Sequence, residues 1–442
     1  MSTRQLTQTD FDVAIVGGGP NGALAAALLA HCSGIEPRRI ALIAPELAPG
    51  GGRGMDSGAS VKRAAVPSAG SLPAPVRVAA LSRASEMVLR NAQVWSRLPQ
   101  DRVSAYQRMR VWHESVPSDG PEVLVFSAAE VAEPNLGYIV ETHAISAAGV
   151  ASFSAQGGQI LGARIDALEV DQHAARLHTS AAPISARLVI GADGAHSRVR
   201  EFLKIPLRTH DYRQSAIVAT IASARAHQDT AWQRFLGTGP LALLPLADGS
   251  SSIVWSADQA MAEELMGLSP EAFAQRLDSA SDGVLGATRL ISERQIVPLQ
   301  RATAATMIGA RTALIGDAAH VVHPLAGQGV NLGFLDAAAM CETLAAGIAE
   351  REDCGAARLL SRYEQQRFTH DTLMSWSMSA FNELFARSGG PGGWLAARLL
   401  GLAGATGIAR RTFARRALGL SGEVPRLARR IQSAARATEA RC

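Results

Sequence analysis

Three glycines near the N-terminus of this 442-residue chain have the spacing Gly-x-Gly-x-x-Gly, which is typical of loops that hold a pyrophosphate. Gly17 would allow a tight turn, Gly19 would let the backbone approach a phosphate, and Gly22 would let the next helix pack closely on the preceding strand. The N–H groups at the start of that helix would be unpaired and partly positive. Because an apolar run leads into Gly17, we expect a dinucleotide site rather than an idle glycine turn.

An acidic residue usually closes the second strand of such a unit and binds the ribose. Here the second apolar run, residues 40–44, ends at Ala44, and the first acidic residue after it is Glu46. Either Glu46 takes that role from two residues further on, or the site does without it.

Two later apolar runs end in a glycine beside an aspartate. Asp193-Gly194 follows residues 187–190, where such a pair is usually only a turn. Gly316-Asp317 follows residues 312–315, where a carboxylate at a strand end would accept hydrogen bonds from sugar-like hydroxyls. Further on, Gly327 and Gly329 would let the backbone approach a flat ligand, and their N–H groups would stabilise negative charge on it.

The elements around these motifs predict an α/β fold. Residues 11–16, 23–31 and 40–44 have the pattern strand, helix, strand, which is the βαβ unit of a doubly wound sheet. Between residues 205 and 300 the pattern changes to strands, with a hairpin predicted at Asp248-Gly249. Helical patterns cover residues 78–98, 329–350 and 359–384. We therefore expect a doubly wound domain with an inserted, mostly antiparallel β-sheet domain and a C-terminal helical region.

Composition excludes several other classes of protein. Hydrophobic residues make up 47% and charged residues 19%, so the chain is globular rather than disordered. Residues 387–442 carry a net charge of +9 and the remainder −5, so only the tail is basic and nucleic-acid binding is not indicated. Four cysteines without metal spacing and an N-terminus without an apolar signal segment predict free thiols, no metal site and a cytoplasmic protein.

The three motifs together resemble, in order and spacing, the class A flavoprotein aromatic hydroxylases. Four further segments are similar to the hydroxylases of ubiquinone biosynthesis: residues 77–82, 136–141, 323–333 and 239–246. The last of these, together with Asp248-Gly249 and Trp255, is most similar to the hydroxylases that act on 2-polyprenyl-6-methoxyphenol. The resemblance runs from about residue 11 to residue 420. Two departures are Ala44, where the family has a strand-end glutamate, and a longer glycine-rich stretch before Arg77.

This resemblance implies an FAD site and a nicotinamide donor, NADH or NADPH, as reductant. Asp193-Gly194 would contact both FAD and the donor, and Gly316-Asp317 would hold the ribityl chain. The residues expected to bind FAD are Gly17, Gly19, Gly22, Glu46, Arg77, Asp193, Gly194, Gly316, Asp317, Gly327, Gln328, Gly329 and Asn331. His320, His323 and Pro324 are expected at the flavin edge, with a structural role as the alternative for either histidine, and a surface salt bridge is the alternative for Arg77.

The domain boundaries follow from the same reading. We expect an FAD-binding domain from residues 11–94, 142–204 and 301–350, a substrate-binding sheet domain from 95–141 and 205–300, and a basic helical region from 351–442. Residues 49–75, rich in Gly, Ala, Ser and Pro, are expected to form a surface loop without an assigned role.

The implied reaction is hydroxylation of the ring of a polyprenylated phenol by O₂ through a flavin C4a-hydroperoxide, in ubiquinone biosynthesis. The alternatives are a hydroxylase of a small soluble aromatic acid, a flavin reductase of isoprenoid double bonds, and a non-catalytic member of a lipid-biosynthesis assembly. An aromatic acid would need a buried Arg or Lys, and none can be placed in the inserted sheet. The basic tail and the lipid substrate further predict peripheral contact with the inner face of a membrane and with other quinone-biosynthesis enzymes.

Overall fold

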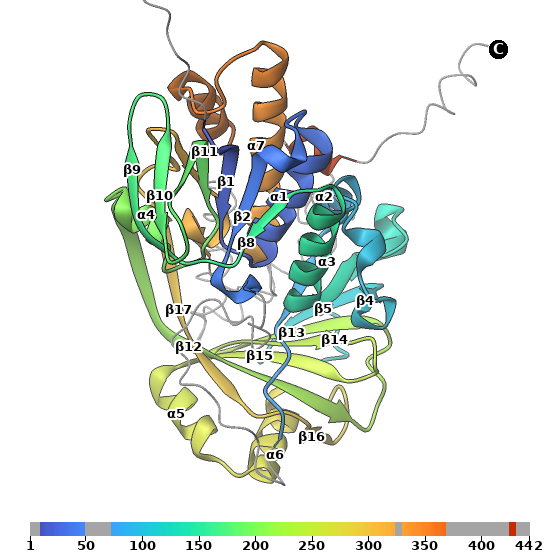
Figure 1. Ribbon diagram of the computed structural model, residues 1–442. Coiled ribbons are helices and arrows are strands. Elements are labelled where there is room, and N and C mark those ends of the chain that lie inside the picture. The colour runs from blue at the N-terminus through green and yellow to red at the C-terminus, as the bar shows by residue number, and fades with distance from the viewer. Residues whose placement is uncertain (1–8, 49–71, 323–328, 368–423, 430–442) are drawn as a thin grey trace, which may run out of the picture.

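The computed structural model describes residues 9–48, 72–322, 329–367 and 424–429 of the chain. Its central sheet has the strand order β18-β19-β11-β1-β2-β8, with β9 and β10 added beside β11 (Figure 1). The five strands from β19 to β8 run parallel, which is the doubly wound arrangement that the sequence predicted. The strands of this sheet are β1 (Phe11–Val16), β2 (Ile40–Ile43), β8 (Gln159–Leu161), β9 (Ile165–Val170), β10 (Ala175–Thr179), β11 (Ile184–Gly191), β18 (Ile308–Gly309) and β19 (Thr312–Leu314).

Helices α1 (Pro20–Cys32), α3 (Thr142–Ala155) and α7 (Gly329–Ala349) pack together against the central sheet. α1 and α3 cross closely, because a Cβ added to Gly149 would lie 2.9 Å from the Cβ of Ala23. Among the described residues, α7 alone has the length and apolarity of a membrane-spanning helix, but 72% of that stretch is buried inside the protein. α7 is therefore accounted for as the core helix of this domain.

The second sheet has the order β20-β17-β12-β15-β14-β13-β5-β6, with β16 paired to β12. Every pairing in it is antiparallel except that of β13 with β5, so the prediction of a mostly antiparallel sheet is confirmed. Its elements are β5 (Arg108–His113), β6 (Leu124–Ser127), β12 (Leu207–Ser223), β13 (Thr230–Leu236), β14 (Gly239–Pro245), β15 (Ser251–Asp258), β16 (Thr288–Leu290), β17 (Gln295–Ala304), β20 (His320–Val321), α5 (Gln259–Gly267) and α6 (Pro270–Ala280).

Figure 1 shows this second sheet between the doubly wound domain and the helices α5 and α6. One face packs on the two helices through a core that includes Ile217, Ile253, Trp255 and Phe273. Side chains alternate between the faces of a strand, so the neighbours of these residues point toward the doubly wound domain. That second face is the one that would meet a ligand held by the first domain.

The prediction of one helix over residues 78–98 is wrong in its first part. Val78–Leu81 is a strand, β3, and pairs with β7 (Gly137–Glu141), which also pairs with β4 (Val103–Tyr106). The helix α2 starts only at Arg83, where the Ser82 hydroxyl accepts a hydrogen bond from the Ser85 N–H, and ends at Asn91. The expected domain boundary after residue 94 therefore separates β3 from two strands of its own sheet, and the boundary after residue 300 falls within β17.

The C-terminal part is described only in two pieces. Residues 357–367 are helical, and residues 424–429 lie against α2 and α7. The Leu427 N–H donates to Glu342 Oε1 at 2.6 Å, and its carbonyl accepts from Asn91 Nδ2 at 2.7 Å. The remaining short elements are α4 (Arg198–Phe202) and the 3₁₀ turns η1 (Pro37–Arg39), η2 (Pro45–Leu47), η3 (Trp95–Arg97), η4 (Gln100–Arg102), η5 (Ala128–Val131), η6 (Gly316–Ala318) and η8 (Arg426–Ala428).

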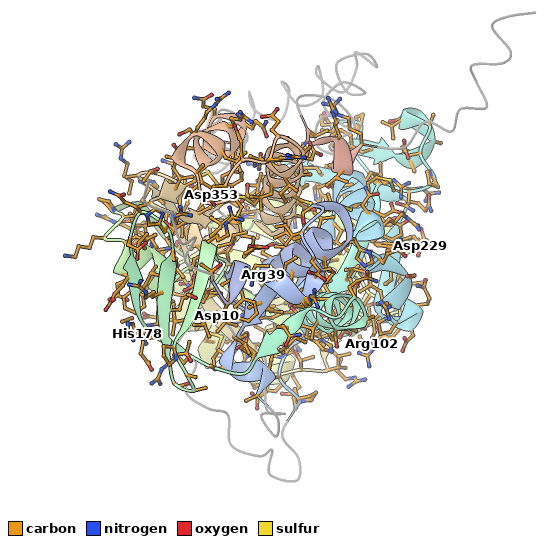
Figure 2. The ribbon with its side chains drawn as sticks, turned by 45° about the horizontal axis from the view of Figure 1, so that its top comes forward. Asp10, Arg39, Arg102, His178, Asp229 and Asp353 are labelled. Carbon is orange, nitrogen blue, oxygen red and sulfur yellow. The ribbon has the colours of Figure 1, made fainter. Side chains whose placement is uncertain are left out.

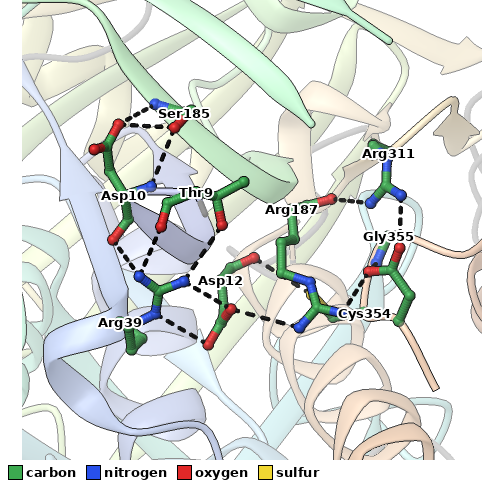
Figure 3. Close-up of polar contacts among 10 residues, drawn as sticks. Thr9, Asp10, Asp12, Arg39, Ser185, Arg187, Arg311, Cys354 and Gly355 are labelled. Carbon is green, nitrogen blue, oxygen red and sulfur yellow. Dashed lines mark hydrogen bonds and ion pairs between the residues drawn. The ribbon is translucent and has the colours of Figure 1, made fainter. Parts of the chain in front are cut away.

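A chain of alternating charges joins the strand starts of the central sheet. Asp12 lies between Arg39, at 3.1 Å, and Arg187, at 3.6 Å, and Asp353 lies between Arg187, at 3.1 Å, and Arg311, at 2.6 Å (Figure 3). Figure 2 looks onto this region and labels Asp10, Arg39 and Asp353 within it. Parallel strands that start at one edge of a sheet end at the opposite edge. These ion pairs therefore lie at the edge opposite the glycine motifs, and they fix the relative positions of the strands that carry the motifs.

Candidate FAD-binding site

The loop between β1 and α1 leaves no room for side chains at two of its glycines. Gly17 has φ +113°, and a Cβ there would lie 2.4 Å from the Ala192 carbonyl oxygen. A Cβ on Gly22 would lie 1.9 Å from the Gly17 carbonyl oxygen. These contacts account for the first and third glycines of the motif, which join the loop to the end of β11 and to its own helix.

The start of α1 is free to hold an anion. Gly19 is the N-cap, no side chain caps the helix, and no acidic residue lies in its first turn. The N–H groups of this turn and the helix dipole therefore have no competing negative charge among the residues of that turn. The side chain of Asn21 is half-buried, and its Oδ1 is enclosed without a hydrogen-bond donor in the described part of the chain.

Glu46 reaches the glycine loop from beyond the end of β2. The turn η2 carries it back, and its Oε1 accepts a hydrogen bond from the Gly18 N–H at 3.2 Å. A Cβ added to Gly18 would lie 2.8 Å from the same Oε1 and 2.9 Å from the Ala44 Cβ. Glu46 thus lies beside the loop, where the ribose of a dinucleotide would need an acid, and its role there stays a prediction.

The side chain of Asp193 organises its own motif. It accepts from the Ser197 hydroxyl at 2.5 Å, the Arg198 N–H at 2.7 Å and the Val199 N–H at 3.2 Å, and so caps α4. Burial raises the pKa of Asp193, against these hydrogen bonds, which lower it. Gly194 has φ +83°, and there is open space where a Cβ would lie. Glycine is therefore favoured here by the backbone conformation and not by a close contact.

An arginine that the sequence did not single out joins the second motif to the third. The Arg200 guanidinium donates to the Ala195 carbonyl at 2.8 Å and to the Ala318 carbonyl at 2.9 Å. It therefore holds the turn after Asp193-Gly194 against the turn that contains Gly316-Asp317.

Gly316 brings the third motif onto the first. It has φ +60°, and a Cβ there would lie 2.2 Å from Asn21 Nδ2. The side chain of Asp317, next in the chain, is exposed, yet enough protein surrounds it that desolvation raises its pKa, an effect that Asp336 adds to and His320 opposes. A carboxylate that is accessible and still surrounded by protein lies in a recess, which suits the predicted contact with a ribityl hydroxyl.

Behind that turn lies a buried cluster of three charged or titratable side chains. Asp336 Oδ2 lies 2.7 Å from His320 Nε2 and accepts from the Gly316 N–H at 2.9 Å, while Asp336 Oδ1 accepts from Arg367 Nε at 2.6 Å. Burial alone would raise the pKa of Asp336, but His320, Arg367 and the Gly316 N–H together hold it well below its ordinary range. His320 is 6% exposed, and its Nε2 atom is engaged with the buried Asp336. This nitrogen therefore has a structural role, which was the alternative to a place at the flavin edge.

The remaining predicted residues differ in what surrounds them. The half-buried Arg77 forms no ion pair with a described residue, so the alternative of a surface salt bridge has no support there. The Asn331 Oδ1 accepts hydrogen bonds from the Ser82 N–H and the Ser85 hydroxyl, and its Nδ2 donates to the Ala80 carbonyl. Asn331 thereby joins α7 to β3 and α2. Gly329 is the first residue of α7. His323, Pro324, Gly327 and Gln328 lie outside the described residues.

The residues present fit FAD. The three motifs, far apart in the sequence, bring four features together. These are the glycine loop, in which a Cβ on Gly17 or Gly22 would clash, the uncapped start of α1, the carboxylate of Glu46 beside the loop, and the enclosed Asn21 Oδ1, which has no donor among the described residues. Within the described ranges, no group of three His, Cys, Asp or Glu side chains is placed so that it could hold a metal ion. The fold and this site define an FAD-dependent flavoprotein with a separate sheet over the cofactor region.

Comparison with known proteins places the chain within that class. A family model described as FAD binding domain matches residues 142–375. The 3-demethoxyubiquinol 3-hydroxylase of Escherichia coli (strain K12) is 31% identical over 427 residues, which cover 94% of this chain and 100% of that protein. The ubiquinone biosynthesis monooxygenase COQ6, mitochondrial, of Homo sapiens is 30% identical over 432 residues, covering 87% of each chain. The chain belongs to the family of FAD-dependent aromatic monooxygenases that contains the hydroxylases of ubiquinone biosynthesis.

Solved structures agree in fold. The p-nitrophenol 4-monooxygenase PnpA from Pseudomonas putida DLL-E4 matches with a TM-score of 0.70 at 18% identity, covering 94% of this chain and 100% of that one. PqsL of P. aeruginosa, in complex with 2-aminobenzoylacetate, matches with a TM-score of 0.69 at 22% identity, covering 88% and 99%. The predicted fold class, the FAD requirement and the assignment as an aromatic hydroxylase are confirmed.

Proposed function

We propose that this protein hydroxylates the aromatic ring of a polyprenylated phenol in ubiquinone biosynthesis, with NADH or NADPH as reductant and O₂ as the oxygen source. Bound FAD would supply the redox chemistry, and the protein would bind the ring, orient it and exclude water. The relatives from Escherichia coli and Homo sapiens, whose names place them in ubiquinone metabolism, support this choice of pathway.

One observation supports a lipid-like substrate over an aromatic acid. The sheet face turned toward the doubly wound domain carries the cross-strand row Gln233, Ala242, Val254 and Val218. The rows on either side contain Leu244, Ser252 and Thr220, and Ser256, Ala216 and Val297. None of these residues is charged, so these rows offer no Arg or Lys to a carboxylate.

The same face offers apolar surface. Val218, Val254 and Val297 are only half-buried there, which leaves part of each side chain accessible. A prenylated ring would cover this surface, and the resulting dry pocket would protect a reactive oxygen species from water.

The test is oxidation of NADH and NADPH by the FAD-loaded protein with three additions: none, a prenylated phenol, and 4-hydroxybenzoate. We expect the prenylated phenol to accelerate oxidation and to gain one oxygen atom from isotope-labelled O₂. Hydroxylation of 4-hydroxybenzoate without hydroxylation of the prenylated phenol would contradict the proposal and favour the soluble aromatic acid.

We also infer that the protein acts at a membrane surface. The net charge of +9 in residues 387–442 supports this, since basic residues are attracted to anionic lipid. A polyprenylated phenol would itself reside in the membrane.

A further inference from the structure

Gln233 is the polar member of the cross-strand row that faces the doubly wound domain. On β13 it lies opposite Ala242 of β14 and Val111 of β5, and the row continues through Val254 to Val218. Its neighbours two residues away on the strand are packed: Ala231 contacts a cluster with Ala80 and Ile139, and Phe235 lies in another apolar cluster. A glutamine is therefore held at a fixed place in an otherwise apolar surface.

Gln233 is buried, and its amide has no partner among the described residues. The residue is only 5% exposed, and its side chain forms no hydrogen bond with any described residue. Gln214, by contrast, uses its Nε2 to donate to the Thr238 carbonyl at 3.1 Å. The hydroxyls of Thr220 and Ser252, in the neighbouring row, are fully enclosed, whereas the Gln233 amide is not. It keeps a narrow contact with accessible space.

Because the Gln233 amide is largely buried but still accessible, a ligand that reaches it can form the hydrogen bonds that the protein leaves open. The amide carries both donors and an acceptor, so it suits a phenol hydroxyl or a phenolate equally. The residues of its row are apolar, so the remainder of such a ligand would be hydrocarbon. One polar contact in an apolar pocket is the usual way in which a site fixes the orientation of a ring.

We propose that Gln233 binds the ring oxygen of the phenolic substrate and so determines which ring edge faces the FAD. This rests on the proposed function. Gln233 is a specificity-determining residue of the hydroxylation: it discriminates phenols from rings without oxygen, and it takes no proton in the reaction.

The experiment compares two probes that differ in one oxygen atom, 2-prenylphenol and prenylbenzene. Binding of each to the oxidised, FAD-loaded protein is measured from the change in flavin absorbance, and the ratio of the two Kd values is the readout. The variants are Gln233→Leu and Gln233→Met, the second in case the first does not fold. Gln300→Leu, an exposed glutamine on β17 of the same sheet, is the matched control.

We expect the wild type and Gln300→Leu to prefer 2-prenylphenol by at least about tenfold, because a site built to bond an oxygen rejects the analogue without it. In the folded Gln233 variants this preference should fall by roughly three- to tenfold, as expected for one neutral hydrogen bond. FAD content should be unchanged in all of them.

The outcomes separate the two proposals. If the wild type hydroxylates 2-prenylphenol and the Gln233 variants keep the wild-type ratio, the assignment of Gln233 is wrong and the function stands. If the FAD-loaded wild type neither binds nor hydroxylates 2-prenylphenol, the proposed function is wrong, and the role of Gln233 is wrong with it.

Discussion

Two aspartates that both sit beside a glycine at a strand end have different surroundings in this protein. Asp193 is bonded to one hydroxyl and two N–H groups of its own turn, whereas Asp317 is exposed in a recess of the protein. A carboxylate whose acceptors are already used stabilises the loop, and one that remains accessible can contact a ligand. The difference makes Asp317 the better candidate for a direct contact with FAD.

We predict that Asp317→Ala weakens FAD binding about ten- to a hundredfold, because a charge-assisted hydrogen bond contributes roughly 1.5–3 kcal/mol. Titration of the apoprotein with FAD, followed by flavin fluorescence, measures this. Asp317→Asn keeps an acceptor oxygen and should lose less. Equal FAD affinity in Asp317→Ala and the wild type would remove the residue from the site.

A second prediction at this scale compares two glycines with left-handed backbone. Gly17→Ala should lose most of its bound FAD, because the new Cβ meets the Ala192 carbonyl oxygen at 2.4 Å. Gly157→Ala is the control: it has φ +84° with nothing within 4 Å of a Cβ, so it bears only the backbone strain of about 1–2 kcal/mol. FAD content after purification and the Tm separate the two. Similar FAD loss in both variants would mean that strain, not the contact with β11, explains the effect.

The buried carboxylate of Asp336 gives a pH prediction. Its pKa lies below the ordinary value of about 3.9, so its contribution to stability is complete above that value and declines as the pH falls toward the folded-state pKa. Asp336→Asn leaves Arg367 and His320 without their anion and should be less stable by about 3–5 kcal/mol at neutral pH.

Denaturant unfolding of both proteins between neutral pH and about pH 3 tests this. The advantage of the wild type should narrow below about pH 4. A difference that stays the same down to about pH 3, or that grows, would contradict the assignment of a lowered pKa to Asp336.

At the scale of elements, the site depends on turns that contact one another across long stretches of chain. The turn after β19 packs on the first residues of α1 through Gly316 and Asn21, and it is joined to the turn after β11 through Arg200. The Asp336 carboxylate of α7 holds the same turn from behind through the Gly316 N–H. Three elements therefore fix the position of Asp317 before any ligand binds.

We predict that Arg200→Ala weakens FAD binding by about tenfold or more, because it removes two hydrogen bonds from a charged donor to backbone carbonyls. The neighbouring Arg198→Ala is the control, since Arg198 is exposed and its guanidinium lies over the Phe202 ring. Both variants lose the same charge from α4, so stopped-flow measurement of FAD release compares position alone. If both release FAD at the same rate, the link between the two turns does not hold the cofactor.

At the scale of the whole molecule, the two sheets divide the work of the proposed reaction. The doubly wound sheet presents the glycine motifs at one edge, and the second sheet presents rows of uncharged side chains toward it. At the opposite edge, the alternating charges of Arg39, Asp12, Arg187, Asp353 and Arg311 join the strand starts. Most of these side chains are partly exposed, and ion pairs of this kind contribute little alone, so the charges act together by linking several strands.

The basic tail gives the prediction for the whole molecule. Replacement of Arg410, Arg411, Arg415 and Arg416 by Gln should reduce flotation with anionic liposomes at low salt, since each basic residue near such a surface contributes about 1 kcal/mol. These substitutions leave residues 424–429 in place on α2 and α7. The wild type should float less at high salt. Equal flotation of the two proteins at low salt would show that the tail is not the membrane contact.

Local sequence was sufficient for the parts of this protein that local physics decides. Gly17 and Gly22 mark a turn that only glycine can make at that closeness, and the apolar runs before residues 17, 191 and 316 are long enough for buried strands of a doubly wound sheet. The hairpin at Asp248-Gly249 was equally predictable, because a two-residue turn signal lies between two strands. Apart from the contact of Gly17 with Ala192, these features depend on residues that are close in the chain.

Tertiary structure alone decided which side chains are used and for what. Arg200 bonds the carbonyl of Ala318, 118 residues away, and Asn331 bonds Ala80, 251 residues away, so no spacing rule reveals either contact. Val78–Leu81 looked helical because its apolar residues fit a helix, yet pairing with β7 made it a strand. The Gln233 side chain, whose amide has no partner in the described part of the chain, faces the doubly wound domain only because of the register of five strands. Burial and pairing are set by the whole fold, and a sequence pattern records only which residues are able to take part.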